Sequence, residues 1–165
     1  MFDGRNNGCI LFETNTNGSQ PATRLKITER GGFTFNNAEL VERVNITAGK
    51  LSANVNIPLS DGMVHYFTTQ ETTTCTPNIR IDSSNALNDA MDTADVVTVT
   101  LITTAAAAGY HTNITIDGNA VTEEWVGGSA PSAGGSDGLD VYTYTIIKTG
   151  NNAYTVLANL TNCSN

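Results

Sequence analysis

The sequence predicts an all-β protein, and three observations support this prediction. Only 15% of the residues are charged, and Thr and Asn supply most of the polar surface. Thr is β-branched and suits pleated, half-exposed strands, whereas Asn and Gly suit the turns between them. Apolar and polar residues also alternate strictly in several runs, which is the period of half-buried strands.

Shorter apolar runs occupy the first third of the chain, at residues 10–12, 25–27, 33–35, 44–46 and 51–57. They have little apolar material from which to build a core of their own. Chains of this kind gain a core by intertwining with identical copies, as in trimeric β-prism or β-helical shafts. We therefore expect residues 1–60 to form a shaft-like attachment segment, with a boundary near residues 58–62.

Residues 61–165 are expected to form a jelly-roll-like β-sandwich of about seven or eight strands. Val97, Val99 and Leu101 alternate with threonines, and runs 141–148 and 154–160 repeat this pattern. In the run 110–116, Tyr110, Ile114 and Ile116 should face away from His111, Asn113 and Thr115.

The breaks between these runs predict turns, one loop and one helix. Asp117-Gly118-Asn119 and Gly150-Asn151-Asn152 predict hairpin turns, because Gly and Asn tolerate positive φ. Residues 127–138 are rich in Gly, Ser, Ala and Pro and predict a surface loop. Residues 84–91 predict a short helix with a Ser or Asn cap, in which Leu87 and Met91 are four residues apart.

Charge argues against two classes of partner. The formal net charge is −8, from 8 Lys and Arg against 16 Asp and Glu. Nucleic acids and anionic membranes both require clustered cations, which the sequence lacks. No apolar run is long enough to span a bilayer, and no signal peptide is recognisable. We expect neither nucleic-acid binding nor membrane insertion.

Cysteine and histidine give no catalytic pattern. Cys9, Cys75 and Cys163 are far apart and odd in number, so we interpret them as buried or idle thiols and leave a disulfide open. His65 and His111 are 46 positions apart, and no Cys lies beside a His in the sequence. A G-x-S-x-G elbow and an H-E-x-x-H zinc motif are also absent.

Carboxylates are the stronger candidates for chemistry. Glycoside hydrolysis requires two carboxyl groups across a sugar, which could come from five acidic residues. These are Asp117, Glu123, Glu124, Asp137 and Asp140. The acidic turn 137–140 could also offer oxygen ligands to calcium, but it lacks the ordered spacing of an EF-hand. We interpret all of these as solvated charges, and we expect no enzymatic activity, no metal and no cofactor.

Trp125, the only tryptophan, has two interpretations. A lone tryptophan in a sandwich usually belongs to the core, but one ahead of a Gly-Gly turn could also stack on a sugar ring. The Gly-rich loop that follows lacks the Lys and the helix of a phosphate cradle, so nucleotide binding is not expected.

Two parts of the chain resemble phage fibre proteins. Residues 11–18 (L-F-E-T-N-T-N-G) and 23–28 (T-R-L-K-I-T) resemble a shaft repeat of phage tail fibres, although Gly31-Gly32-Phe33 departs from its usual ending. About the last 80 residues resemble a domain at the ends of fibre-like structural proteins of marine phages, including cyanophages. That resemblance rests on residues 95–101, 109–110, 116–118, 125–131, 140–147 and 154–157.

The resemblance implies a non-enzymatic virion component, usually a homotrimer, that is assembled in the host cytoplasm. We expect a tail fibre or fibre tip that contacts other virion proteins and a glycan or protein of the host surface. The contact candidates are Asp117, Asn119, Trp125, Ser129, Ser132, Ser136 and Asp137. A head fibre or capsid decoration protein without host contact is the main alternative, and a glycan-cleaving tail spike is a third.

Overall fold

The structure is a computed structural model that describes residues 8–15, 18, 20–36 and 38–164. Strands account for 46% of it and helix for almost none, so the predicted all-β class is confirmed. The chain divides into two compact units, Met1–Glu42 and Arg43–Asn165, and each is described by itself.

The first unit is a three-stranded antiparallel sheet in the order β1 (Ile10–Thr14), β2 (Ala22–Ile27) and β3 (Phe33–Phe35). Its register sets two apolar rows side by side on one face. These rows are Ile10, Ile27 and Phe33, and Phe12, Leu25 and Phe35. The phenylalanines remain open to solvent, with Phe12 52%, Phe33 66% and Phe35 43% exposed. This sheet therefore has one apolar face that is only partly covered.

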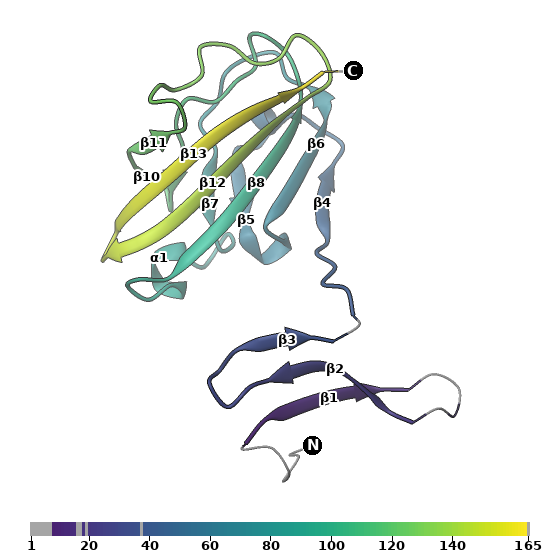
Figure 1. The fold of residues 1–165 in the computed structure, drawn as a ribbon. Coiled ribbons are helices and arrows are strands. Elements are labelled where there is room, and N and C mark those ends of the chain that lie inside the picture. Colours follow the sequence, from purple (N-terminus) through teal and green to yellow (C-terminus); the bar gives the residue numbers. More distant parts are fainter. Residues whose placement is uncertain (1–7, 16–17, 19, 37, 165) are drawn as a thin grey trace. The chain divides into compact units, whose positions relative to one another are not determined.

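In the second unit the chain passes back and forth between a larger and a smaller sheet (Figure 1). The larger sheet receives β4 (Val44–Thr47), β6 (Val64–Gln70) and β8 (Val96–Thr104). The smaller sheet receives β5 (Asn56–Pro58), β7 (Asn78–Arg80) and β9 (Thr115–Ile116). Strands of successive turns pair in parallel within each sheet. Three successive turns of chain thus form short solenoid-like coils, each giving one strand to each sheet.

The C-terminal part of the chain extends both sheets. The long hairpin of β12 (Leu139–Gly150) and β13 (Ala153–Cys163) pairs antiparallel with β8. The larger sheet ends with β11 (Glu123–Trp125), which pairs in parallel with β13. β10 (Asn119–Ala120) borders the smaller sheet. The helical segments are α1 (Leu87–Ala90) and two 3-10 turns, η1 (Leu51–Ala53) and η2 (Leu59–Asp61).

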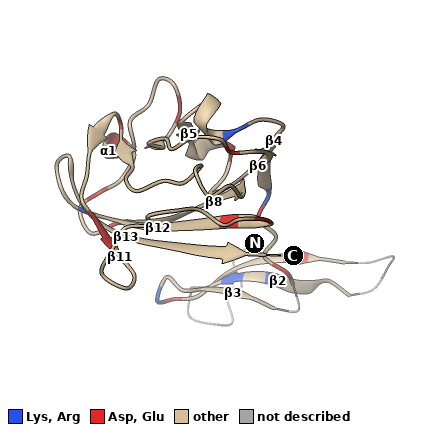
Figure 2. Ribbon diagram, turned by 90° about the horizontal axis from the view of Figure 1, so that it is seen from above, with Lys and Arg blue, Asp and Glu red and all other residues tan. Residues whose placement is uncertain are grey.

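Both sheets of the second unit contribute to one core, and β5 and α1 lie on the same side of the β8–β12–β13 layer (Figure 2). Ile57, Ile79 and Ile116 lie opposite one another in the smaller sheet and are almost fully buried. The larger sheet supplies Val99, Leu101, Tyr142, Tyr144, Ile146 and Val156. The alternation predicted for runs 97–103, 141–148 and 154–160 is therefore confirmed.

The predicted boundary near residues 58–62 is wrong, because the second unit begins at Arg43. Leu51, Ile57 and Leu59 were assigned to the shaft segment, but they pack into the core of the second unit. The jelly-roll expectation is also wrong. A jelly roll is built from antiparallel Greek keys, whereas β4 to β9 pair in parallel because the chain changes sheet after every strand.

The hairpin turns are confirmed. Ile116 pairs with Asn119, which leaves Asp117 and Gly118 as the turn with φ of 52° and 80°. Gly150 pairs with Ala153 across the second turn, where Asn152 has φ of 50°. Positive φ in two-residue loops fits the right-handed twist of the flanking strands.

Two local predictions were wrong in extent. The helix spans only Leu87–Ala90, and its N-terminus is capped by a distant carboxylate rather than by Ser84 or Asn85. The run 110–116 forms a strand only at Thr115–Ile116, and His111 is buried with Ile114 and Ile116 instead of facing away from them. No helix of the described residues is long and apolar enough to cross a membrane.

Candidate ligand-binding pocket

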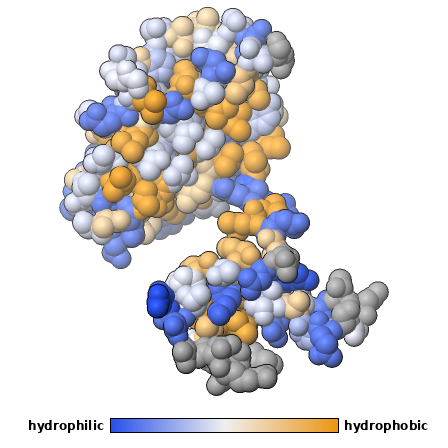
Figure 3. Space-filling model, viewed as in Figure 1, coloured by the Kyte–Doolittle hydropathy of each residue, from blue (hydrophilic) through white to orange (hydrophobic). Residues whose placement is uncertain are grey.

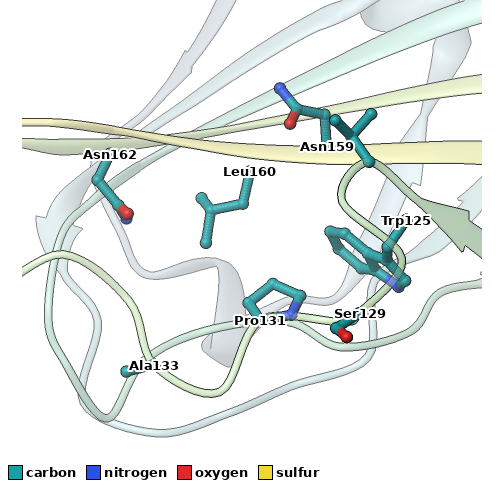
Figure 4. Close-up of a pocket in the computed structure, with 8 residues that line it drawn as sticks. Trp125, Ser129, Pro131, Ala133, Asn159, Leu160 and Asn162 are labelled. Atoms are coloured by element: carbon teal, nitrogen blue, oxygen red, sulfur yellow. The ribbon is translucent and has the colours of Figure 1, made fainter.

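A pocket of about 220 Å³ lies between the end of β13 and the loop that follows β11 (Figure 4). Its lining combines aromatic, aliphatic, hydroxyl and amide groups. The residues are Trp125, Val126, Ser129, Pro131, Ala133, Asn159, Leu160 and Asn162. Leu160 and Asn162 project from β13 toward the loop, whereas Asn159 projects from the opposite side of the strand (Figure 4).

Trp125 forms one end of this pocket and also packs against the core. Its backbone lies opposite Ala158 in the parallel register of β11 and β13. Its ring meets Tyr144 edge-on, with ring centroids 6.2 Å apart at 77°. The indole is half-buried and contacts the core on one side, while the pocket takes part of its remaining surface. Its packing agrees with the core interpretation of Trp125, whereas stacking on a sugar ring stays a prediction.

Backbone hydrogen bonds hold the first turn of the loop. The N–H of Val126 donates to the carbonyl of Ala158, and the N–H of Gly128 donates to the carbonyl of Trp125, each at 2.9 Å. Gly127 and Gly128 adopt φ of 87° and 80°, which side-chain-bearing residues rarely adopt. The chain therefore reverses directly after Trp125 and passes back over the pocket.

Asp140 anchors the far end of the loop. It is fully buried, and both carboxylate oxygens accept the N–H of Gly135 at 3.0 Å. The side-chain amide of Asn162 donates to the same carboxylate at 2.7 Å. The N–H of Gly134 donates to the carbonyl of Ala107 at 3.1 Å. The loop forms one wall of the pocket and β13 forms the other, and the Asp140 carboxylate links the two through Gly135 and Asn162.

The structure separates the predicted contact residues. Trp125 and Ser129 line the pocket, whereas Ser132, Ser136 and Asp137 lie on the exposed surface of the same loop. Asp117 lies in the β9–β10 turn and Asn119 begins β10, and neither of them lines the pocket. The predicted set lacked the other six lining residues, which are Val126, Pro131, Ala133, Asn159, Leu160 and Asn162. No sequence signal indicated the parallel pairing of β11 with β13 that brings them together.

Three of the five candidate carboxylates bind backbone N–H groups. Their interpretation as solvated charges is wrong for Asp140, which is 0% exposed. Asp117 accepts the N–H groups of Leu87 and Asn88 at 2.8 and 2.9 Å and so caps α1. Glu123 accepts the N–H of Ile114 at 2.6 Å, and Asp140 holds the loop as described above. Among the described residues no three His, Cys, Asp or Glu side chains are grouped to hold a metal ion.

The fold brings a Cys and a His into contact that are far apart in sequence. Sγ of Cys75 lies 3.3 Å from Nδ1 of His111. Burial raises the pKa of the Cys75 thiol to about 12 and lowers the pKa of His111 to about 4. The pair is therefore a thiol and a neutral imidazole rather than the thiolate of a nucleophilic cysteine. Cys9, Cys75 and Cys163 are all free.

No known protein-family model, curated protein or solved structure matches the chain. The resemblance to phage fibre proteins therefore remains a prediction from the segments quoted above.

Proposed function

We propose that the chain is a non-enzymatic fibre-type virion protein that forms a homotrimer through its first unit and attaches to the host surface through its second. The observation that carries this proposal is the apolar face of the β1–β2–β3 sheet. Its two rows present three phenylalanines that are 43% to 66% exposed. Orange, apolar surface is visible on this unit in Figure 3.

The small size of this sheet supports another copy of the chain as the layer that covers its apolar face. A sheet of three short strands is stable only when one face packs against another layer. The first unit has no second layer of strands or helices among its described residues. Three copies that packed these faces together would bury Phe12, Phe33 and Phe35 in one shared core.

The charge distribution favours association at the first unit. That unit carries four Lys and Arg against five Asp and Glu, a net charge of −1. The second unit carries four against eleven, a net charge of −7, and its basic residues are few in Figure 2. Identical chains repel one another least where their charge is lowest, so the first unit is the favoured place of contact.

The second unit supports the attachment role. Its two sheets share one core, as in a β-sandwich, and this scaffold holds the anchored loop beside Trp125 at its surface. Binding sites are often found on loops held by rigid strands. The expected partners are the chain itself, other virion proteins and a host-surface glycan or protein, without nucleic acid or membrane insertion.

Light scattering of the full chain across a dilution series tests the assembly. We expect a molar mass near three times 17.4 kDa. Phe33→Lys places a charge in the apolar face and should yield monomers. Thr34→Lys, the matched control, places the same charge on the opposite face of the same strand and should leave the trimer intact.

A wild-type monomer at every concentration would refute the trimer and would favour an accessory decoration protein. Equal masses for the two variants would show that the apolar face is not the contact. Circular dichroism checks that each variant keeps its strand content, and Trp125 fluorescence checks that the second unit is unchanged.

A further inference from the structure

The geometry points to a binding site for one neutral saccharide ring in the Trp125 pocket. The inference deepens the proposed attachment function and takes its biological meaning from it. The ring would lie between the loop after β11 and the strand β13, with its C–H face against Trp125 and Leu160. Its hydroxyl groups would meet Ser129 and Asn162.

The lining has the two-sided chemistry of a sugar. A pyranose ring presents an apolar C–H face and a rim of hydroxyl groups. Trp125, Pro131 and Leu160 provide apolar surface, and aromatic rings suit such C–H contacts. The Ser129 hydroxyl can both donate and accept a hydrogen bond, and the Asn162 amide adds a carbonyl acceptor beside the N–H group that binds Asp140.

Size limits the ligand to about one ring. The pocket holds about 220 Å³. Sites for drug-sized ligands typically measure about 300–1,000 Å³, so this pocket is too small to enclose an extended ligand. A longer glycan would place one residue in the pocket and continue over the exposed loop.

Charge selects a neutral sugar. The eight lining residues include no charged side chain. The nearby carboxylate of Asp140 is buried and bound to Gly135 and Asn162, and the whole unit has a net charge of −7. An anionic sugar would find no cation in the lining and would be repelled by the surrounding charge.

The walls are formed before the ligand binds. The loop is tied at Val126, Gly128, Gly134 and Gly135, close to both ends of its span over the pocket. Binding therefore requires little ordering of the protein, which lowers the free-energy cost of association.

Tryptophan fluorescence of the full-length protein tests the site directly, because Trp125 is the only tryptophan. The probes are the methyl glycosides of glucose, galactose, mannose and N-acetylglucosamine, with the methyl glycoside of glucuronic acid as the charged counterpart. We expect a saturable change in emission for at least one neutral glycoside, with a dissociation constant in the millimolar range. The glucuronide should bind at least tenfold more weakly.

Two variants locate the binding. Ala133→Phe fills the pocket from an exposed lining position and should abolish the saturable change. Ser132→Phe, the matched control, adds the same ring at the neighbouring exposed position outside the lining and should bind as the wild type does. Phenylalanine leaves Trp125 as the only tryptophan in both variants.

The inference is overturned if no neutral glycoside gives a saturable change, if Ala133→Phe binds like the wild type, or if the glucuronide binds equally well. Light scattering on the same samples separates it from the assembly proposal. A trimer that binds no sugar refutes the saccharide site alone, whereas a monomer that binds sugar refutes the trimer alone.

Discussion

Acid should destabilise the second unit through His111. Its side chain is 0% exposed, its ring centroid lies 4.5 Å from that of Tyr142, and Nε2 has no hydrogen-bond partner in the described part of the chain. Burial lowers the pKa of His111 from 6.5 to about 4. A backbone hydrogen bond at Cys75 and the charge of Asp140 oppose this shift but are smaller.

The sign and size follow from linkage between protonation and folding. Between pH 6.5 and about 4 the unfolded chain binds a proton at His111 that the folded chain does not. The free energy of unfolding therefore falls as the pH falls through this window. At about 1.4 kcal/mol per pKa unit, the full loss is about 3 kcal/mol. Below pH 4 both states are protonated and His111 adds no further loss.

Urea unfolding followed by Trp125 fluorescence at pH 7, 6, 5 and 4 measures this effect. His111→Gln is the control, because it keeps polar atoms at the site and removes the titration. Other titrating groups, including His65 and the carboxylates, are the same in both proteins. The wild type should lose about 3 kcal/mol more than the variant between pH 7 and pH 4. Parallel losses in the two proteins would refute the reasoning.

Three further outcomes are expected. Ile79→Ala opens a cavity between Ile57 and Ile116 in the smaller sheet and should lower the free energy of unfolding by about 2–5 kcal/mol in urea titrations. A loss well under about 1 kcal/mol would contradict the core shared by the two sheets. Asp117→Ala removes the cap of α1 and should lower the free energy of unfolding by about 1–2 kcal/mol. Asn119→Ala, two residues later at the start of β10, should be nearly neutral in the same titrations. With a pKa of about 12, the fraction of Cys75 that is thiolate at pH 8 is only on the order of 10⁻⁴. Ellman's reagent should therefore label the exposed Cys163 first and Cys75 only after unfolding. Equal labelling rates in the folded protein would contradict this.

The sequence by itself determined the strand character and the turns, because both depend on residues that are close along the chain. Alternation in β8, β12 and β13 separates Val99, Tyr144 and Val156 from their outward neighbours, and each of these side chains is buried as predicted. Asp117-Gly118 and Asn151-Asn152 predicted turns because these residue types accept positive φ.

Only the tertiary structure decided how the strands are connected. β5, β7 and β9 have two or three residues each, which is too short for a detectable period. Parallel pairing joins Val44 to Val64 and Val64 to Thr100 across intervening strands of the other sheet. No local pattern records such long-range partners, so the sequence predicted a jelly roll where the chain forms coils.

The same limit applies to the pocket and to the buried pair. Trp125 and Ser129 are close in sequence and were predicted as contact residues, but Leu160 and Asn162 join them only because β11 pairs with β13. Cys75 meets His111 because the turns before β7 and β9 lie in successive coils. Residue types along the chain indicate which groups are available, whereas the register between distant strands decides which of them meet.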